Sequence, residues 1–398
     1  MDNLYKTFYQ LLSRTNTDFV RYLYSKISWK NRLIAITGAR GAGKTTMLLQ
    51  HIKKNFGETP KNVLYVSLDN IYFSNNHLLD LAHDFDKTGG KYLFIDEVHN
   101  YKNWSIEIKN IYDSLPDLNV VFTGSSMLEI YKGNADLSRR VAHYTLNGLS
   151  FREFILFEKK IDFPTLKLDD LFENHILIAS QINKQIKPIP LFQQYLTEGF
   201  YPYYKEDSEI YGSRLLHTIN VVLETDLPAV ENIEIQTIKK IKQLLYIIAQ
   251  RVPFTPNIKE LAEILEVSRK SLLTYLIYLE KAQLVGLLQQ DVSGLRTLSK
   301  PEKIYLDNSN LIYALESEKP DIGNIRETFF FNQLKTVSKI TSGNKADFKI
   351  NDKFTIEVGG KNKGHEQIMG LQNAYLALDN LEYGFMNKIP LWLFGFLY

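Results

Sequence analysis

The stretch that decides the fold of the first part of the chain is Leu33-Ile-Ala-Ile-Thr-Gly-Ala-Arg-Gly-Ala-Gly-Lys-Thr-Thr46. Residues 33–37 form a short apolar and β-branched run that predicts a buried strand, and residues 46–53 predict a helix. Between them, residues 38–45 fit the pattern G-x-x-x-x-G-K-[ST] in the strand-loop-helix context that the pattern requires. This combination is typical of a loop that binds phosphate groups.

Glycines in such a loop let successive main-chain N–H groups point at phosphate oxygens, and the following helix adds positive partial charge. We expect Lys44 to neutralise the β and γ phosphates of ATP and the Thr45 hydroxyl to bind Mg²⁺. The residues expected to surround the nucleotide are Gly38, Ala39, Arg40, Gly41, Ala42, Gly43, Lys44, Thr45 and Thr46.

A second apolar run, residues 91–95, ends in Asp96 and Glu97. Strands of a parallel sheet present their carboxyl ends to ligands at one edge, so these carboxylates should lie near the phosphate loop. Asp96 suits Mg²⁺, held directly or through water, and Glu97 suits a base that polarises the attacking water.

A hydroxyl and an arginine complete the candidates in this region. The predicted strand 119–123 leads into Ser125, which either contacts the γ phosphate or caps the next helix. Arg139 and Arg140 could each reach a nucleotide of the same subunit or of a neighbouring subunit in a homo-oligomer, and surface solvation is the alternative.

Strand and helix alternate up to residue 150, with strands expected at 33–37, 63–68, 92–95, 120–123 and 141–146. This alternation predicts an α/β fold in which residues 1–150 form a P-loop ATPase core with a mostly parallel sheet.

The remaining chain divides into three predicted parts. Helical periodicity over 166–187, 191–199 and 211–250 predicts a helical lid and linker region at 151–250. In 251–320, helices at 257–265 and 269–282, with Ser268 as an N-cap, precede strands at 286–290 and 303–306 and outline a winged helix-turn-helix. Residues 321–398 predict a small α/β domain with a helix at 326–337, strands at 346–350 and 354–358, and a helix at 366–378.

Charge and composition restrict the partners. The chain has 47 Lys and Arg against 45 Asp and Glu, a net charge of +2, so it has no bulk attraction to nucleic acid or anionic membrane. Cysteine is absent, which excludes disulfides and thiolate zinc sites. No signal peptide is visible, and the longest apolar run, 389–398, is about half the length that spans a bilayer. We therefore expect a cytoplasmic protein without membrane contact.

Several stretches together carry a family resemblance: residues 33–46, Leu93-Phe-Ile-Asp-Glu-Val-His99, Phe122-Thr-Gly-Ser-Ser126, Leu137-Ser-Arg-Arg140 and Leu149-Ser-Phe-Arg-Glu-Phe154. Along nearly the whole chain, the sequence resembles the prokaryotic AAA-type ATPases that carry a C-terminal domain of unknown function. The resemblance implies a helical lid, matched by residues 195–202, and a winged helix whose end is matched by residues 300–307. It also implies that Arg140 is the better arginine candidate.

The same resemblance implies a restriction-endonuclease-like fold at the C-terminal end. Such nucleases gather Mg²⁺ with an acid on a helix, an Asp on one strand and a Glu-x-Lys on the next. The chain offers Glu327, Asp347 and Glu357, but Gly359 stands at the lysine position and Lys361 follows two residues later. Either Lys361 reaches back through the flexible glycine turn, or the acids are solvated charges on a scaffold that cuts nothing.

Two functions therefore stay open on the sequence. One is Mg²⁺-dependent ATP hydrolysis coupled to a nuclease-like module that binds DNA or a protein partner. The other is a nucleotide-gated binding switch with a degenerate, non-cleaving nuclease-like domain. Residues 251–305 hold eight Lys or Arg and six Asp or Glu, a net charge of only +2. Arg269 and Lys270, which open the second helix there, could contact DNA. The alternative is that this helix packs against protein, since it is apolar at Leu272, Leu273, Leu276, Ile277 and Leu279.

Overall fold

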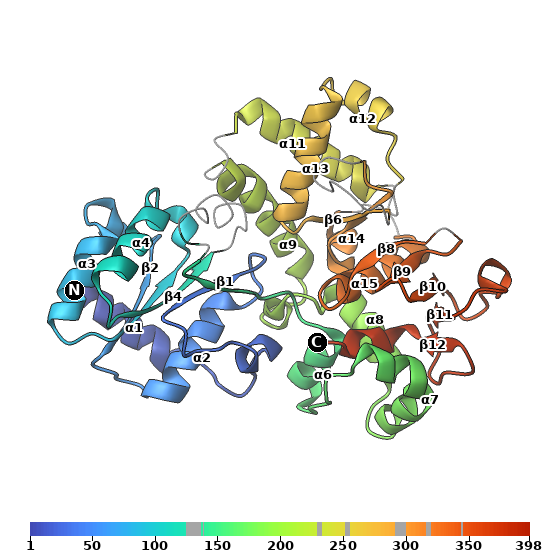
Figure 1. The fold of residues 1–398 in the computed structure, drawn as a ribbon, viewed down its shortest axis with the longest axis horizontal. Helices are drawn as coiled ribbons and strands as arrows, with labels where there is room; N and C mark the ends of the chain where they lie inside the picture. Colours follow the sequence, from blue (N-terminus) through green and yellow to red (C-terminus); the bar gives the residue numbers. More distant parts are fainter. Residues whose placement is uncertain are drawn as a thin grey trace. The chain divides into compact units, whose positions relative to one another are not determined.

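Two compact units make up the protein in the computed structural model (Figure 1). The structure describes residues 1–124, 137, 139–228, 233–250, 255–290, 300–315, 320–343 and 345–398. The first unit consists of Met1–Gly148 and Asn220–Glu234, and the second of Leu149–Ile219 and Ile235–Tyr398. The segment Asn220–Glu234 therefore departs from the predicted 151–250 region and belongs with the phosphate loop.

A five-stranded sheet forms the centre of the first unit, in the order β2-β3-β4-β1-β5, and all its neighbouring strands are parallel. The predicted parallel sheet is confirmed. Its apolar strands are largely buried, as expected where helices cover a parallel sheet. The strands are β1 (Leu33–Thr37), β2 (Val63–Ser67), β3 (Tyr92–Asp96), β4 (Asn119–Gly124) and β5 (Ala142–Thr145).

The helices of the first unit bury one apolar face each. Leu4, Phe85 and Trp104 of three different helices join one core with residues of the sheet. The helix after the phosphate loop begins at Lys44, so its first N–H groups lie at the carboxyl end of β1. The helices are α1 (Asp2–Arg14), α2 (Lys44–Phe56), α3 (Leu78–Lys87) and α4 (Trp104–Ser114).

Helices dominate residues 151–250, as predicted. They are α6 (Phe151–Lys159), α7 (Leu168–Asn183), α8 (Pro188–Glu198), α9 (Tyr211–Val221) and α11 (Ile235–Ala249). The capping box of Ser150 and Glu153 fixes the start of α6. The helical periodicity over 211–250 is interrupted, because a π-helical turn, Val222–Asp226, follows α9.

The two helices and two strands predicted within 251–320 form close to their predicted bounds. Helices α12 (Ile258–Ile264) and α13 (Arg269–Lys281) precede the antiparallel pair β6 (Val285–Leu288) and β7 (Lys303–Leu306). The Ser268 side chain accepts a hydrogen bond from the Ser271 N–H at 3.0 Å, which confirms Ser268 as the N-cap of α13.

A second five-stranded sheet occupies the C-terminal part, in the order β12-β11-β10-β9-β8. Strands β10, β11 and β12 are parallel, and β8, β9 and β10 are antiparallel. Helices α14 (Ser309–Leu315) and α15 (Ile322–Lys335) precede it. The strands are β8 (Ile340–Ser342), β9 (Phe348–Ile350), β10 (Phe354–Gly359), β11 (Ala374–Leu378) and β12 (Lys388–Pro390).

The helix predicted over 366–378 is wrong. Glu366–Ile368 forms a single 3₁₀ turn, and Ala374–Leu378 is strand β11, which pairs with β10 and β12 on its two sides. Short apolar runs fit a buried strand as well as a helix, and here pairing with two neighbouring strands decides the outcome.

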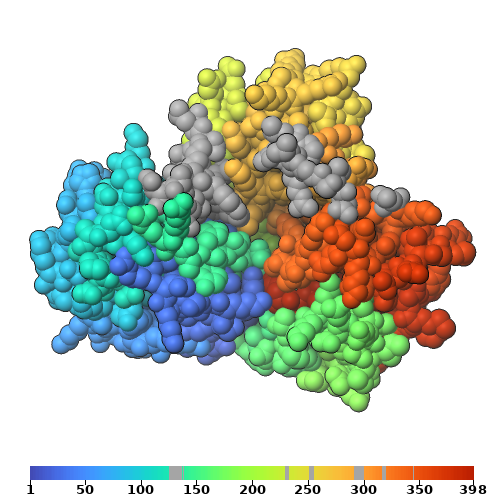
Figure 2. Space-filling view, viewed as in Figure 1, coloured from blue at the N-terminus to red at the C-terminus, as the bar shows by residue number. Residues whose placement is uncertain are grey.

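Helix α7 packs against the C-terminal sheet, although the two are far apart in sequence. The rings of Phe172 and Phe354 stack with centroids 4.2 Å apart, and Asn183 donates a hydrogen bond to the Glu382 carbonyl at 2.9 Å. Figure 2 shows the corresponding green and red surfaces side by side. This part of the predicted lid therefore belongs to the same unit as the C-terminal sheet.

Candidate functional site

The phosphate loop connects β1 to α2 in a conformation that requires glycine. Gly38, Gly41 and Gly43 have φ angles of 149°, 84° and 95°, a region that other residues rarely adopt. A Cβ atom at Gly38 would also collide with the main-chain oxygen of Leu146 on the neighbouring chain segment. Gly43 directly precedes α2, so the loop curls around the N-terminal end of that helix.

Lys44 is buried inside this loop. Its Nζ donates hydrogen bonds to the carbonyl oxygens of Gly38 and Ala39, each at 2.9 Å. Burial lowers the pKa of Lys44, while the carboxylates of Glu97 and Asp96 act in the opposite direction. The ammonium group is therefore held by main-chain oxygens at the position from which it can reach an anion in the loop.

Asp96 joins the phosphate loop to three strands. The Thr45 hydroxyl donates to its Oδ2 at 2.6 Å and the Tyr65 hydroxyl to the same oxygen at 2.8 Å, while the Thr123 hydroxyl donates to Oδ1. Tyr65 lies on β2 and Thr123 on β4, the two strands beside β3. The carboxylate is thus fixed from both sides, and burial beside Asp96 raises the pKa of Tyr65 far above its usual value.

Glu97 follows with a left-handed backbone, at a φ of 54°. Its N–H donates to Thr123 Oγ1 at 3.2 Å, and its Oε2 lies 3.4 Å from Nε2 of His99. Burial raises the pKa of Glu97, and burial lowers the pKa of His99 to about 4. His99 is therefore neutral at pH 7, and it faces the carboxylate without adding a positive charge.

Arg40 of the phosphate loop contacts a residue that the sequence analysis did not single out. Its Nη1 lies 3.1 and 3.2 Å from the two oxygens of Asp226, whose side chain is 3% exposed. Asp226 ends the π-helical turn and belongs to the first unit. Its position 186 residues after Arg40 explains why no local signal reveals it.

The other predicted residues of this site differ in their surroundings. Thr46 is exposed on the first turn of α2. Arg140 forms an ion pair with Asp113 of α4, with its Nε 3.1 Å from Oδ1. Ser125 lies outside the described residues, and the nearby hydroxyl that contacts Asp96 belongs to Thr123.

The C-terminal acids come together in what we call the carboxylate cluster: Glu327, Asp347, Glu357, Lys303 and Lys363. Nζ of Lys303 on β7 lies 3.1 Å from both Glu327 Oε2 and Asp347 Oδ1. The Asp347 N–H donates to Glu357 Oε2 at 3.2 Å, which links the third acid to the first two. Burial and the nearby Asp347 raise the pKa of Glu327.

The lysine beside Glu357 is Lys363 and not the predicted Lys361. Lys363 Nζ lies 2.6 Å from Glu357 Oε1, whereas Lys361 is exposed. The turn after Gly359 continues far enough that the later lysine returns to the strand, and the Lys363 side chain packs beside Gly359. Burial raises the pKa of Glu357, and the hydrogen bond from Lys363 opposes this rise.

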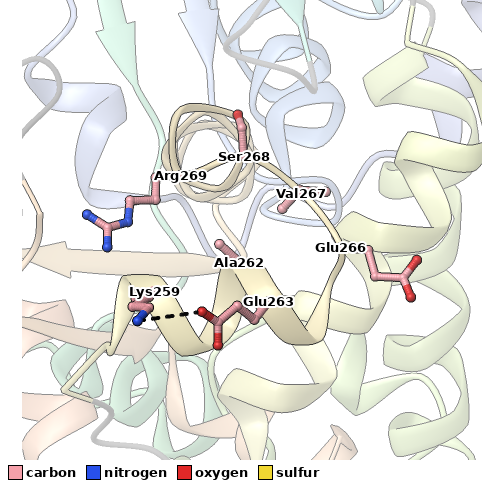
Figure 3. Close-up of a pocket in the computed structure, with 7 residues that line it drawn as sticks. All are labelled: Lys259, Ala262, Glu263, Glu266, Val267, Ser268 and Arg269. Atoms are coloured by element: carbon pink, nitrogen blue, oxygen red, sulfur yellow. Dashed lines mark ion pairs between the residues drawn. The ribbon is translucent and has the colours of Figure 1, made fainter.

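A hollow lies at the turn between α12 and α13 (Figure 3). Lys259 and Arg269 contribute positive charge to its lining, and Glu263 and Glu266 contribute negative charge. Lys259 forms an ion pair with Glu263 at 3.9 Å. The local charge is therefore balanced, which gives this surface no strong electrostatic preference for nucleic acid.

Two structural findings concern metal ions and membranes. Across the residues that the structure describes, no group of three or more His, Asp or Glu side chains has a geometry that could hold a metal ion, the carboxylate cluster included. Within the same residues, no helix is both long enough and apolar enough to cross a membrane.

Two protein families match parts of the chain. Residues 30–155 match the family described as an AAA domain, and residues 189–321 match a domain of unknown function, DUF8612. The first match covers the phosphate loop, the acidic end of β3 and all five strands of the first sheet. It supports an AAA-type ATPase core in this part of the chain.

Similar proteins include Uncharacterized protein MJ1637 of Methanocaldococcus jannaschii, 28% identical over 322 residues that cover 74% of this chain and 66% of that protein. Uncharacterized protein MJ1544 of the same organism is 27% identical over 77% of this chain and 67% of that protein. The chain spans about two thirds of the length of these relatives.

Among solved structures, the Walker-type ATPase Paby2304 of Pyrococcus abyssi aligns at a TM-score of 0.41 and 12% identity, over 72% of this chain and 91% of that chain. AMPPCP-bound DnaA from Aquifex aeolicus aligns at a TM-score of 0.26 and 16% identity, over 70% and 88%.

Proposed function

We propose that the first unit binds ATP at the phosphate loop and hydrolyses it. The observation that carries this proposal is the 2.6 Å contact between Thr45 Oγ1 and Asp96 Oδ2, because it joins the end of the loop to the acidic end of β3. Residues 38–46 surround the triphosphate with main-chain N–H groups and the N-terminus of α2. Lys44 exchanges its loop carbonyls for phosphate oxygens and neutralises their charge.

The residues beside the loop fit a Mg²⁺ ion bound with the nucleotide. Thr45 offers a hydroxyl and Asp96 a carboxylate, which are the hard oxygen ligands that Mg²⁺ takes. The ion, when bound, supplies positive charge to the β and γ phosphates. Tyr65 and Thr123 hold the Asp96 carboxylate in a fixed orientation, so it needs little rearrangement when the nucleotide arrives.

Glu97 accepts the proton of the attacking water in this proposal. Its raised pKa brings it closer to neutral pH, which favours a general base. The neutral ring of His99, 3.4 Å away, orients the carboxylate without removing its charge. Arg140 reaches the nucleotide of the same or a neighbouring subunit once it leaves Asp113.

Replacement of Glu97 tests the proposed hydrolysis. We expect Glu97→Gln to lower the ATP turnover number by about 10²- to 10⁴-fold, because the amide cannot accept the proton, while ATP binding is retained. Glu58→Gln, at an exposed position outside the site, is the matched control. Turnover that is unchanged in Glu97→Gln contradicts this role of the residue.

The nucleotide state of the first unit, we infer, controls the second unit, in which α12 to β7 form a winged helix. The partner that the second unit binds is either DNA or a protein. ATP turnover measured with and without DNA separates the two classes: stimulation by DNA supports a nucleic-acid partner. Turnover that depends on Glu97 but responds to no nucleic acid supports a switch that acts on a protein.

The C-terminal sheet leaves two candidate roles, an active nuclease and a nuclease-like scaffold. The position of Lys303 between Glu327 and Asp347 favours the scaffold, because its ammonium group already forms ion pairs with both acids and occupies the place between them. Incubation of plasmid and single-stranded DNA with Mg²⁺ or Mn²⁺ distinguishes the roles. Cleavage that is lost in Glu357→Ala, but kept in the exposed control Glu366→Ala, supports a nuclease. Clean preparations that cleave in neither metal support the scaffold.

A further inference from the structure

A buried carboxylate lies in the phosphate site without a part in the chemistry proposed above. Asp226 comes from Asn220–Glu234, a segment of the first unit whose two ends continue into α9 and α11. It stands at the end of a π-helical turn, a rare irregularity that often marks functional positions in helices. The segment therefore brings a charge from a distant part of the chain to the phosphate loop.

Arg40 contacts this carboxylate directly. The Arg40 side chain is 41% exposed and the Asp226 side chain 3% exposed, and Nη1 is within 3.2 Å of both carboxylate oxygens. Arg40 lies between Gly38 and Lys44, so its backbone is part of the loop expected to surround a triphosphate. An arginine at this place can bind either a carboxylate or a phosphate with the same donor groups.

The charge of Asp226 influences the ionisation of three other residues of the site. It favours the charged form of Lys44, opposes the ionisation of Glu97 and favours protonation of His99. The γ phosphate of a triphosphate that reaches Arg40 meets the negative charge of Asp226, and little water is available to screen that charge because the side chain is buried.

We propose that the Asp226 carboxylate occupies Arg40 when no nucleotide is bound. The γ phosphate of a nucleoside triphosphate then replaces this carboxylate as the partner of Arg40. The inference rests on the proposed binding of ATP. Arg40 then turns from Asp226 to the phosphate, and the like charges of the phosphate and the carboxylate drive Asp226 away from the loop. Because the turn Val222–Asp226 directly follows α9, this displacement pulls on that helix.

The proposal also predicts that the site distinguishes triphosphate from diphosphate. ADP lacks the γ phosphate that competes for Arg40, so the pair of Arg40 and Asp226 persists when ADP is bound. The ATP form and the ADP form then differ in the position of the turn Val222–Asp226. This difference is the signal that the second unit receives through the chain.

Calorimetric titration of Asp226→Asn with ATP and with ADP, each with Mg²⁺, tests the proposal. We expect ATP affinity to rise by at least about fivefold, and the ratio of ATP to ADP affinity to rise with it. The matched control is Glu224→Gln, which removes one negative charge from the same turn at an exposed position. Its ATP affinity stays within about twofold of the wild type.

The outcomes separate this inference from the proposed function. A wild type that takes up no ATP contradicts both. If the wild type binds ATP and Asp226→Asn binds it equally or more weakly, only the inference is overturned. Asp226 would then have a structural role, which is to hold its turn in place through Arg40.

A second measurement leaves Asp226 intact and so does not depend on the folding of a variant at that position. The chain has no cysteine, so Glu224→Cys provides a single position for an environment-sensitive fluorophore. We expect saturating ATP to change its emission, ADP to change it less, and Lys44→Ala to abolish the response. Emission that stays constant while ATP binds overturns the inference.

Discussion

The phosphate site and the carboxylate cluster both combine acids at strand ends with lysines, but the lysines have different partners. Lys44 donates to two main-chain carbonyls, whereas Lys303 and Lys363 contact carboxylates directly. In the phosphate site, Asp96 accepts hydrogen bonds from neighbouring hydroxyl groups. In the carboxylate cluster, the acids form ion pairs with ammonium groups.

This difference separates a site whose lysine is held by uncharged carbonyl oxygens from a site whose lysines are already paired with carboxylates. Lys44 therefore turns to a phosphate by exchanging neutral partners for a charged one. The ion pairs of Lys303 satisfy Glu327 and Asp347 within the protein, and a divalent cation has to displace an ammonium group before it can bind there. The comparison therefore predicts that the two sites respond differently when one charged group is removed.

The largest effect on stability is expected at Asp96. In Asp96→Asn the side chain keeps its size but loses an acceptor for the buried hydroxyls of Tyr65 and Thr123, so the free energy of unfolding should fall by about 2–4 kcal/mol. ATP turnover should be lost as well. Chemical denaturation measures the first effect, and Asp69→Asn, an exposed acid near the end of β2, is the control. A variant as stable as the wild type contradicts the network drawn around Asp96.

The sequence predicted the parts of the phosphate site that are local. The motif at residues 38–45 and the strand that ends in Asp96 are each contiguous, and their chemistry follows from the residues themselves. Tyr65 and Thr123 escaped prediction because their role depends on the strand order β2-β3-β4, which no local pattern encodes. A hydroxyl at the end of a strand beside an acidic strand end is the signal that could have found them.

Removal of Lys303 gives the next effect. In Lys303→Met, Glu327 and Asp347 face each other without an ammonium group, and we expect a loss of about 1–2 kcal/mol in the free energy of unfolding, because the cluster is only partly exposed. Lys361→Met, at an exposed position in the same unit, should change stability little. Equal stability of the two variants would show that Lys303 does not neutralise the cluster.

Lys363 should give the smallest effect, and that effect depends on pH. Without this lysine, the raised pKa of Glu357 rises further, since the hydrogen bond that lowers it is gone. Folded protein then binds a proton more readily than unfolded protein, so stability is recovered as pH falls. The deficit of Lys363→Met should be about 1 kcal/mol near pH 7.5 and should shrink toward pH 5. A deficit that grows on acidification contradicts the pairing of Glu357 with Lys363.

The second unit was less predictable for two physical reasons. A glycine turn decides which lysine returns to Glu357, and its length cannot be counted from spacing alone, so Lys361 was chosen instead of Lys363. The run 374–378 has an apolar pattern compatible with helix or strand, and its pairing with β10 and β12 decides between them. Both failures arise where long-range contacts override a local signal.

Calorimetric titration with ATP and Mg²⁺ tests the central claim most directly. It measures how the affinity for ATP changes when the Lys44 ammonium group is removed from the phosphate loop. We predict that the wild type binds ATP, that Lys44→Ala weakens binding by at least about tenfold, and that the exposed control Lys54→Ala leaves it unchanged. A wild type that releases no heat with ATP, or a Lys44→Ala variant that binds as tightly as the wild type, would contradict the account.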